Sequence, residues 1–235
     1  MNFSNLLNQV LGSVKQAGEQ ISKSDNMPDT ITKVGGGAAA VGVLSMLLGR
    51  GGGSSLAKVG SLAALGSLAY QAYQNYQKNN GNVSVSDLIE GAFSHKSEQV
   101  AEQTSNVILR TMIAIAACDR VIDEQERQAI LSEGGSTPEI QQWIIDEMAQ
   151  PASVEVIAQQ VGNNPALASE VYLAARIVCG AELSRKEIVF LSQLAQALNL
   201  DDKLVEQLEK QAGFAERSEE RRVGKECRSR WSPYH

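Results

Sequence analysis

The sequence predicts an all-α protein, a compact bundle of about seven helices preceded by a glycine- and alanine-rich apolar stretch. Between residues 97 and 212, apolar residues recur at three- and four-residue spacing, and no stretch alternates as a strand would. Glycine, proline and asparagine divide this region at intervals that suit helix ends. We expect helices over residues 97–117, 123–133, 137–149, 152–161, 165–179, 184–198 and 201–212.

The composition argues against several classes of protein. The 235 residues carry 21 basic and 27 acidic side chains, a net charge of −6, which is unlike a protein that neutralises nucleic-acid phosphates. Two histidines and three separated cysteines do not suit a histidine-rich zinc site or a disulfide framework. The sequence also shows no nucleophile–base pair and no phosphate-binding glycine loop. We therefore expect a non-enzymatic protein with no nucleic-acid partner.

The N-terminal region, residues 1–30, is expected to form a short amphipathic helix and a linker. Over residues 3–22, apolar side chains fall at helical spacing with polar ones between them. The apolar face of this helix has two interpretations, packing on protein or lying on a membrane surface. Pro28 marks the linker that follows.

Residues 31–78 form the glycine- and alanine-rich apolar stretch, in which we expect two helices around a glycine turn. Residues 34–49 carry no charge, and residues 56–70 carry only Lys58. A sixteen-residue helix is about 24 Å long, short of the roughly 30 Å hydrocarbon core of a bilayer. Two alternatives remain, a tilted or re-entrant membrane hairpin and a segment that self-associates in water. Residues 79–96 are expected to be a linker.

The C-terminal residues 213–235 differ from the rest of the chain. From Glu216 onward the sequence is rich in arginine and glutamate and has no apolar period. Its last part, residues 222–235, resembles the translated cloning-vector tails found at the ends of unrelated sequences. We expect this tail to be disordered and leave it out of the fold.

An internal repeat relates the two halves of the helical region. A shift of 61 residues places Cys118 on Cys179, and it also aligns two capping boxes. The first capping box pairs Asp123 with Glu126, and the second pairs Ser184 with Glu187. The repeat predicts two related helical hairpins at the centre of the bundle. The two cysteines are expected to be small buried residues at equivalent helix ends.

A family resemblance rests on the same residues. Residues 108–127, ILRTMIAIAACDRVIDEQER, are similar to the pattern of the YebE-like proteins, a family of unknown function in the tellurite-resistance TerB-like superfamily. Residues 168–175 and 187–200 are similar to the second half of that family. The resemblance implies a TerB-like helical domain over residues 97–212. It also implies an inner-membrane protein, because members carry an apolar glycine- and alanine-rich segment before the domain.

This chain departs from the family pattern at two places. The family has Asp-Gly where this chain has Asp119-Arg120, so a tight glycine turn is not expected there. The family also offers further aspartates before the second glutamate, where this chain has residues 180–183, GAEL. Both departures argue against a functional site shared between the two repeats.

The acidic motif of the first repeat has two interpretations. Asp119, Asp123 and Glu126 place carboxylates on one loop and the first turn of a helix, and hard divalent cations prefer such ligands. The spacing of Asp123 and Glu126 is equally that of a helix cap, which is the commoner outcome. We therefore name these three residues as the candidate metal ligands, with capping as the alternative.

The functional expectation joins these observations. We expect a non-enzymatic protein that associates with the inner membrane through its apolar stretch. Its cytoplasmic helical domain would bind a partner protein or a divalent cation, for example in an envelope or stress response. The alternative is a soluble, cytoplasmic, metal-responsive or stress-related scaffold that self-associates through its glycine-rich segment.

Overall fold

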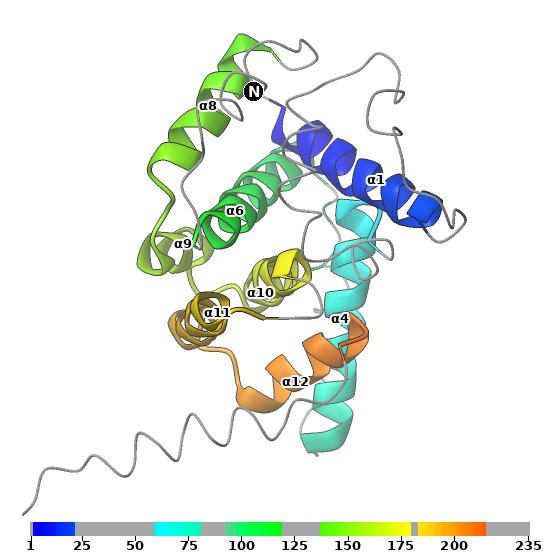
Figure 1. The fold of residues 1–235 in the computed structure, drawn as a ribbon. Coiled ribbons are helices and arrows are strands. Elements are labelled where there is room, and N and C mark those ends of the chain that lie inside the picture. The colour runs from blue at the N-terminus through cyan, green and yellow to red at the C-terminus, as the bar shows by residue number, and fades with distance from the viewer. Residues whose placement is uncertain are drawn as a thin grey trace, which may run out of the picture.

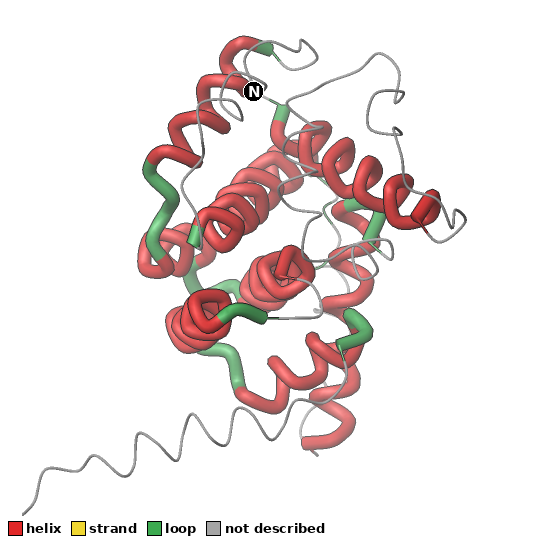
Figure 2. The backbone as a smooth tube through the Cα atoms, in the orientation of Figure 1, coloured by secondary structure: helices red, strands yellow, loops and turns green. Residues whose placement is uncertain are grey.

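The structure is a computed structural model that describes residues 2–21, 59–80, 93, 95, 97–118, 137–179 and 183–214. Within these residues all regular structure is helical, which confirms the predicted all-α class (Figures 1 and 2). The helices are α1 (Phe3–Ile21), α4 (Leu62–Asn80), α6 (Glu98–Ala117), α8 (Pro138–Ala149), α9 (Val154–Val161), α10 (Pro165–Cys179), α11 (Arg185–Ala197) and α12 (Asp202–Gln211).

The helix ends follow the local sequence signals. Ser153 and Asp201 cap α9 and α12 by accepting hydrogen bonds from backbone N–H groups of the first turn. The capping box predicted at α11 is present, because Ser184 and Glu187 each accept a hydrogen bond from the other's backbone N–H. The equivalent box at Asp123 lies outside the described residues, as does the helix expected over residues 123–133.

The centre of the bundle is α10, in which thirteen of fifteen residues are buried. Helices α6, α4, α11, α12 and α9 all pack against it (Figure 1). The sequence of α10 explains this position, since it is composed almost wholly of apolar and small residues and has no polar face. Any charged side chain on this helix is therefore drawn into the core.

Helix α1 packs on α6 with its apolar face. Leu6, Leu7, Val10 and Leu11 are at most 3% exposed. At the start of α1, the backbone N–H groups of its first two residues donate hydrogen bonds of 2.7 and 3.0 Å to the carboxylate of Glu102 in α6. Of the two interpretations of this amphipathic helix, the structure shows packing on the protein itself.

Helix α4 contains the described part of the predicted apolar stretch, and it lies in the same core. Its buried face, formed by Leu62, Leu65, Ala69 and Ala72, packs against α10 and α12. Among the described residues, no helix combines the length and apolar character that a membrane crossing requires. Residues 31–58, the rest of the stretch on which the membrane expectation rests, lie outside the described part of the chain.

Candidate functional site

The residues predicted as metal ligands are not placed by the structure. Asp119, Asp123 and Glu126 all lie outside the described residues. Within the described residues, no group of three or more histidine, cysteine, aspartate or glutamate side chains could hold a metal ion. The cation site therefore stays a prediction from sequence.

The candidate site of the described core is a pair of titratable side chains, Glu170 and His95. Glu170 lies in the second turn of α10, and His95 lies on the segment that precedes α6. The Nε2 atom of His95 is 3.3 Å from Oε1 of Glu170, and the two side chains are 9% and 1% exposed. A buried ionised carboxylate with one partner is costly, so burial favours the neutral form of such a group.

Gly66 of α4 completes the site, because only a glycine fits there. A Cβ atom at this position would lie 2.8 Å from the carbonyl oxygen of Phe93 and 3.0 Å from Oε1 of Glu170. The Phe93 ring also packs against two rings of α4, with centroids 5.7 Å from Tyr70 and 6.2 Å from Tyr73. The site thus joins three parts of the chain: α4, the segment before α6, and α10.

The protonation of Glu170 follows from its burial. Desolvation raises the pKa of this carboxyl, and the hydrogen-bonding and electrostatic influence of His95 lowers it by less, so the pKa stays above its ordinary value. Apart from the 3.3 Å contact with His95, neither Glu170 oxygen has a hydrogen-bond partner among the described residues. The side chains of His95 and Glu170 are too buried, at 9% and 1% exposed, to contact a substrate at the surface. The pair is a buried titratable contact between the segment before α6 and α10.

The sequence analysis did not select these three residues. One signal for Glu170 was present, because it is the only acidic residue in a helix that has no polar face. No local signal pointed to Gly66 or His95, since each owes its role to a neighbour more than seventy residues away in the chain.

A second polar cluster fastens α12 to α10. The hydroxyl of Tyr172 donates a hydrogen bond of 2.8 Å to Oε1 of Glu209, and Nε of Arg176 lies 3.7 Å from the same oxygen. The guanidinium of Arg176 also lies over the ring of Phe214, with Cζ 3.6 Å from the centroid. The packed chain therefore extends to Phe214, two residues into the region that the sequence assigns to the tail.

The two repeat cysteines occupy matching helix ends, as the repeat predicts. Cys118 is the C-cap residue of α6, and Cys179 is the last residue of α10. Cys179 is 1% exposed, its Sγ lies 3.3 Å from the carbonyl oxygen of Ala175, and burial raises the pKa of its thiol. A thiol in this state is a structural residue and not a nucleophile.

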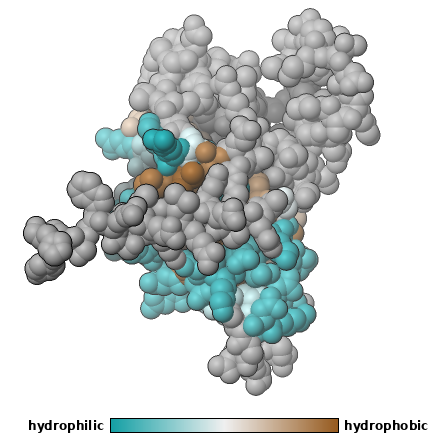
Figure 3. Space-filling model, turned by 60° about the horizontal axis from the view of Figure 1, so that its bottom comes forward, coloured by the Kyte–Doolittle hydropathy of each residue, from teal (hydrophilic) through white to brown (hydrophobic). Residues whose placement is uncertain are grey.

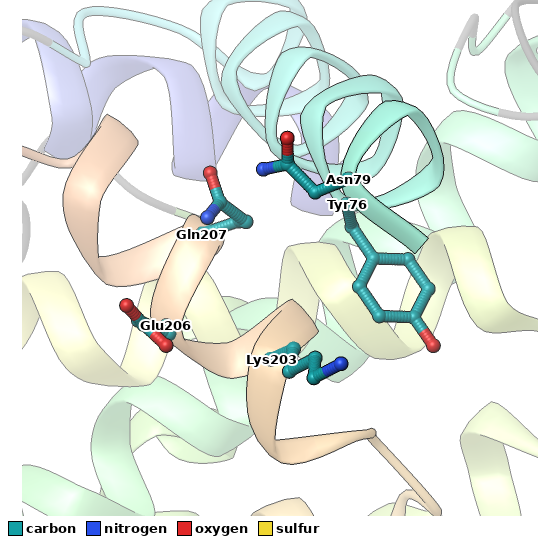
Figure 4. Close-up of a pocket in the computed structure, with 5 residues that line it drawn as sticks. All are labelled: Tyr76, Asn79, Lys203, Glu206 and Gln207. Carbon is teal, nitrogen blue, oxygen red and sulfur yellow. The ribbon is translucent and has the colours of Figure 1, made fainter. Parts of the chain in front are cut away.

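A surface cavity of about 240 Å³ lies between the C-terminal part of α4 and α12. Figure 4 shows its lining, in which Lys203 extends toward Tyr76 while Glu206 points away from α4. The amide side chains Asn79 and Gln207 complete it. One cation, one anion, a phenol and two amides favour no single class of ligand, so we assign none.

Comparison with known proteins identifies a family and no characterised relative. Residues 33–212 match the family described as "Protein of unknown function (DUF533)". Neither a curated protein nor a solved structure matches the chain. The family match runs without a break through the glycine- and alanine-rich segment and the helical bundle, and it ends before the C-terminal tail. The match thus covers both the glycine- and alanine-rich segment and the helical bundle.

Proposed function

The chain belongs to the DUF533 family of unknown function, and we propose that it is a non-enzymatic binding protein of the inner membrane. Residues 34–58 would associate with the membrane and hold the helical bundle at its cytoplasmic surface. The bundle would bind a partner protein or a divalent cation there. The finer family resemblance, to the YebE-like proteins of the TerB-like superfamily, supports the same location.

One observation carries the proposal: the apolar segment runs directly into the core of the bundle. Val59 and Leu62, which follow it in the chain, are 1% and 5% exposed. Only nine residues, 50–58 (RGGGSSLAK), lie between the charge-free run and Val59. A segment bound to a membrane would hold the bundle close to the lipid headgroups instead of letting it diffuse on a long linker.

The surface of the bundle supports partner binding by its own composition. The face seen in Figure 3 is hydrophilic over the lower part of the view, and apolar atoms gather in a smaller area above it. Among the described residues, Ile188 and Val189 of α11 are adjacent, apolar, and 43% and 53% exposed. Exposed Arg185 and Lys186 precede them. This combination suits an acidic amphipathic helix of a partner protein. The alternative ligand, a divalent cation, rests on the acidic motif at residues 119–126.

Cell fractionation tests the membrane part of the proposal. The matched variant replaces residues 34–58 with a glycine, serine and asparagine sequence of the same length, which keeps the spacing between α1 and α4. We expect the full chain to sediment with membranes, to resist a high-salt wash and to be released by detergent. The variant should remain in the high-speed supernatant with an unchanged helical circular dichroism spectrum.

Recovery of the full chain in the supernatant without detergent would contradict membrane association. If that soluble protein eluted as an oligomer and the variant as a monomer, the result would support the self-associating scaffold. Sedimentation of both chains with membranes would assign the association to another part of the protein.

A further inference from the structure

Helix α11 carries two adjacent apolar side chains that the bundle itself does not bury. Among the large apolar side chains exposed in the described part of the chain, only Ile188 and Val189 are neighbours in sequence. β-branched residues form helices less readily than alanine, lysine or glutamine, and at 43% and 53% exposure these two gain little from burial. They therefore lower the stability of the isolated bundle, and a partner that covered them would offset that loss.

The direction of these side chains follows from the packing of α11. Leu191 and Leu194, 3% and 0% exposed, hold the helix against α9 and α10. Val189 precedes Leu191 by two residues, which is about 160° around the helix axis, so it points away from the core. Ile188 borders the same outward face.

The outward face is basic beside the apolar pair. Arg185 and Lys186 are exposed in the first turn of α11, where the helix dipole disfavours positive charge. The single acidic residue of the helix, Glu187, is half-buried, and its carboxylate accepts a hydrogen bond of 2.7 Å from the backbone N–H of Ser184. The dipole and the two cations thus give this end of α11 a positive potential, which favours an anionic occupant. We call Arg185, Lys186, Ile188 and Val189 the α11 patch.

The α11 patch does not suit a lipid surface. A helix that lies on a membrane inserts a continuous apolar face. In α11 that face, with Leu191 and Leu194, is turned into the core. Beyond Val189 the exposed side chains are polar and uncharged, namely Ser192, Gln193 and Gln196.

A second copy of the chain does not suit the α11 patch either. A symmetric dimer through this face would place the Arg185 and Lys186 side chains of both copies next to one another, with no exposed acidic side chain on either α11. A helix with acidic residues beside an apolar row would complement both halves of the patch.

The α11 patch lies away from the junction between the bundle and the apolar stretch. That junction is at Val59 and the start of α4, which packs near α1. Figure 1 shows α1 and the start of α4 on one side of α10 and α11 on the other. A bundle tethered through this junction leaves α11 accessible to a partner.

We infer that the α11 patch is the partner-binding surface of the bundle and that its occupant is an acidic amphipathic helix of another protein, bound on the side of α10 away from the start of α4. This inference rests on the proposed binding of a partner protein. It specifies the surface, the chemistry of the occupant and the direction from which that occupant reaches the bundle.

Selection from a helix library tests the inference with the full chain, purified in the detergent that releases it from membranes. The probe is a phage-displayed helical peptide library in which the outward positions are randomised. The patch variants are Arg185→Glu with Lys186→Glu, and Ile188→Gln with Val189→Gln. Glutamate suits the first turn of a helix and glutamine is a good helix former, so both variants should keep their helical circular dichroism spectrum.

The matched controls change the same residue types at exposed positions of other helices. They are Lys78→Glu on α4 and Val100→Gln on α6. We expect the enriched peptides to carry net negative charge beside an apolar row. Each patch variant should weaken their binding at least tenfold, and the controls should change it less than twofold. Binding should also weaken as the salt concentration rises.

Four results would overturn the inference. The first is enrichment of neutral or basic helices, or of none, and the second is enrichment of acidic helices whose binding the patch variants leave unchanged. In the third, the patch variants lose binding to vesicles that contain phosphatidylglycerol, which would assign the patch to lipid. In the fourth, the natural chain elutes as a dimer and the patch variants as monomers, which would assign it to a second copy.

Failure of this inference and failure of membrane association give different results. The patch variants should sediment with membranes as the natural chain does. Recovery of the natural chain in the soluble fraction would contradict membrane association and leave the α11 patch as a binding surface. A failed selection with a membrane-bound chain would remove the partner helix and leave the divalent cation as the proposed ligand.

Discussion

The Nε2 atom of His95 lies 3.3 Å from Oε1 of Glu170, and this contact joins the segment before α6 to the central helix of the bundle. Gly66 of α4 lies directly against it. Because α4 is also the helix that follows the apolar segment, the same site that holds a buried carboxyl also fixes how that segment is attached. The ionisation of Glu170 and the seating of α4 are therefore expected to influence each other.

The pH dependence of stability should change on Glu170→Gln. The folded state raises the pKa of Glu170, so the carboxyl stabilises the fold while it is protonated. This contribution is fully present below the unfolded pKa and is lost as the pH rises through the folded one. We expect the melting temperature of Glu170→Gln to rise relative to that of the natural chain as the pH increases above the ordinary pKa of a glutamate. Glu139→Gln, the same change at an exposed position of α8, is the control. Parallel pH profiles for Glu170→Gln and the natural chain would contradict this prediction.

Two glycine substitutions should act in opposite directions. Gly66→Ala forces a Cβ atom to within 2.8 Å of the Phe93 carbonyl oxygen, and overpacking of this kind costs about 1–3 kcal/mol. Gly12→Ala, in α1, meets nothing within 4 Å and should stabilise the helix by about 0.5–1 kcal/mol. Urea unfolding at pH 7 measures both. A stabilising Gly66→Ala would show that α4 does not approach Glu170 closely.

The anchoring of α1 should depend on the charge of Glu102. Burial alone would raise the pKa of this carboxyl, but hydrogen bonds from Ser4 and Phe3 outweigh it and hold the pKa below its ordinary value. Its stabilisation is therefore present at neutral pH and is lost as the pH falls through the lowered pKa. Because the site is partly exposed, Glu102→Gln should cost only about 1–2 kcal/mol at pH 7. The difference in unfolding free energy between Glu102→Gln and the natural chain should shrink in acid. Urea unfolding at pH 3 and pH 7 measures it, and an equal difference at both pH values would contradict the prediction.

Truncation should locate the end of the folded chain. Removing residues 216–235 should leave the melting temperature unchanged, because the sequence there has no apolar period with which to join a core. Removing residues 213–235 also removes Phe214, which is 8% exposed and lies beneath the guanidinium of Arg176. This longer deletion should cost about 1–3 kcal/mol. Equal melting temperatures for the two truncations would show that Phe214 adds nothing to the fold.

Two substitutions of Asp123 should distinguish capping from cation binding by the acidic motif. If Asp119, Asp123 and Glu126 hold a divalent cation, the ion should stabilise the protein by about 2.7 kcal/mol at a concentration a hundredfold above its Kd. Both Asp123→Asn and Asp123→Ala should remove that effect. If the motif only caps a helix, Asp123→Asn should be nearly neutral and Asp123→Ala should cost about 1 kcal/mol. Melting curves recorded with calcium, magnesium, manganese and zinc distinguish the two roles. If none of these cations raises the melting temperature, capping is the only role left for the motif.

Helix positions could be predicted from the sequence because their signals are local. Apolar spacing and capping residues act within a few residues of chain, and the predicted capping box of Ser184 and Glu187 is present at the start of α11. Helices α9, α11 and α12 begin within two residues of where the sequence places them. The repeat likewise predicted the matching ends of α6 and α10.

Only the tertiary structure decided which surfaces pack together. From the sequence alone, the apolar face of α1 could pack on a membrane or on protein equally well. The residues of α4 were assigned to an apolar stretch separate from the bundle. Their places in the core depend on partners far along the chain, such as Glu102 for α1 and Glu170 for Gly66. Such contacts depend on shape and burial, which periodicity does not encode. The sequence by itself therefore determined which segments are helices, and the packed core determined which residues form the site.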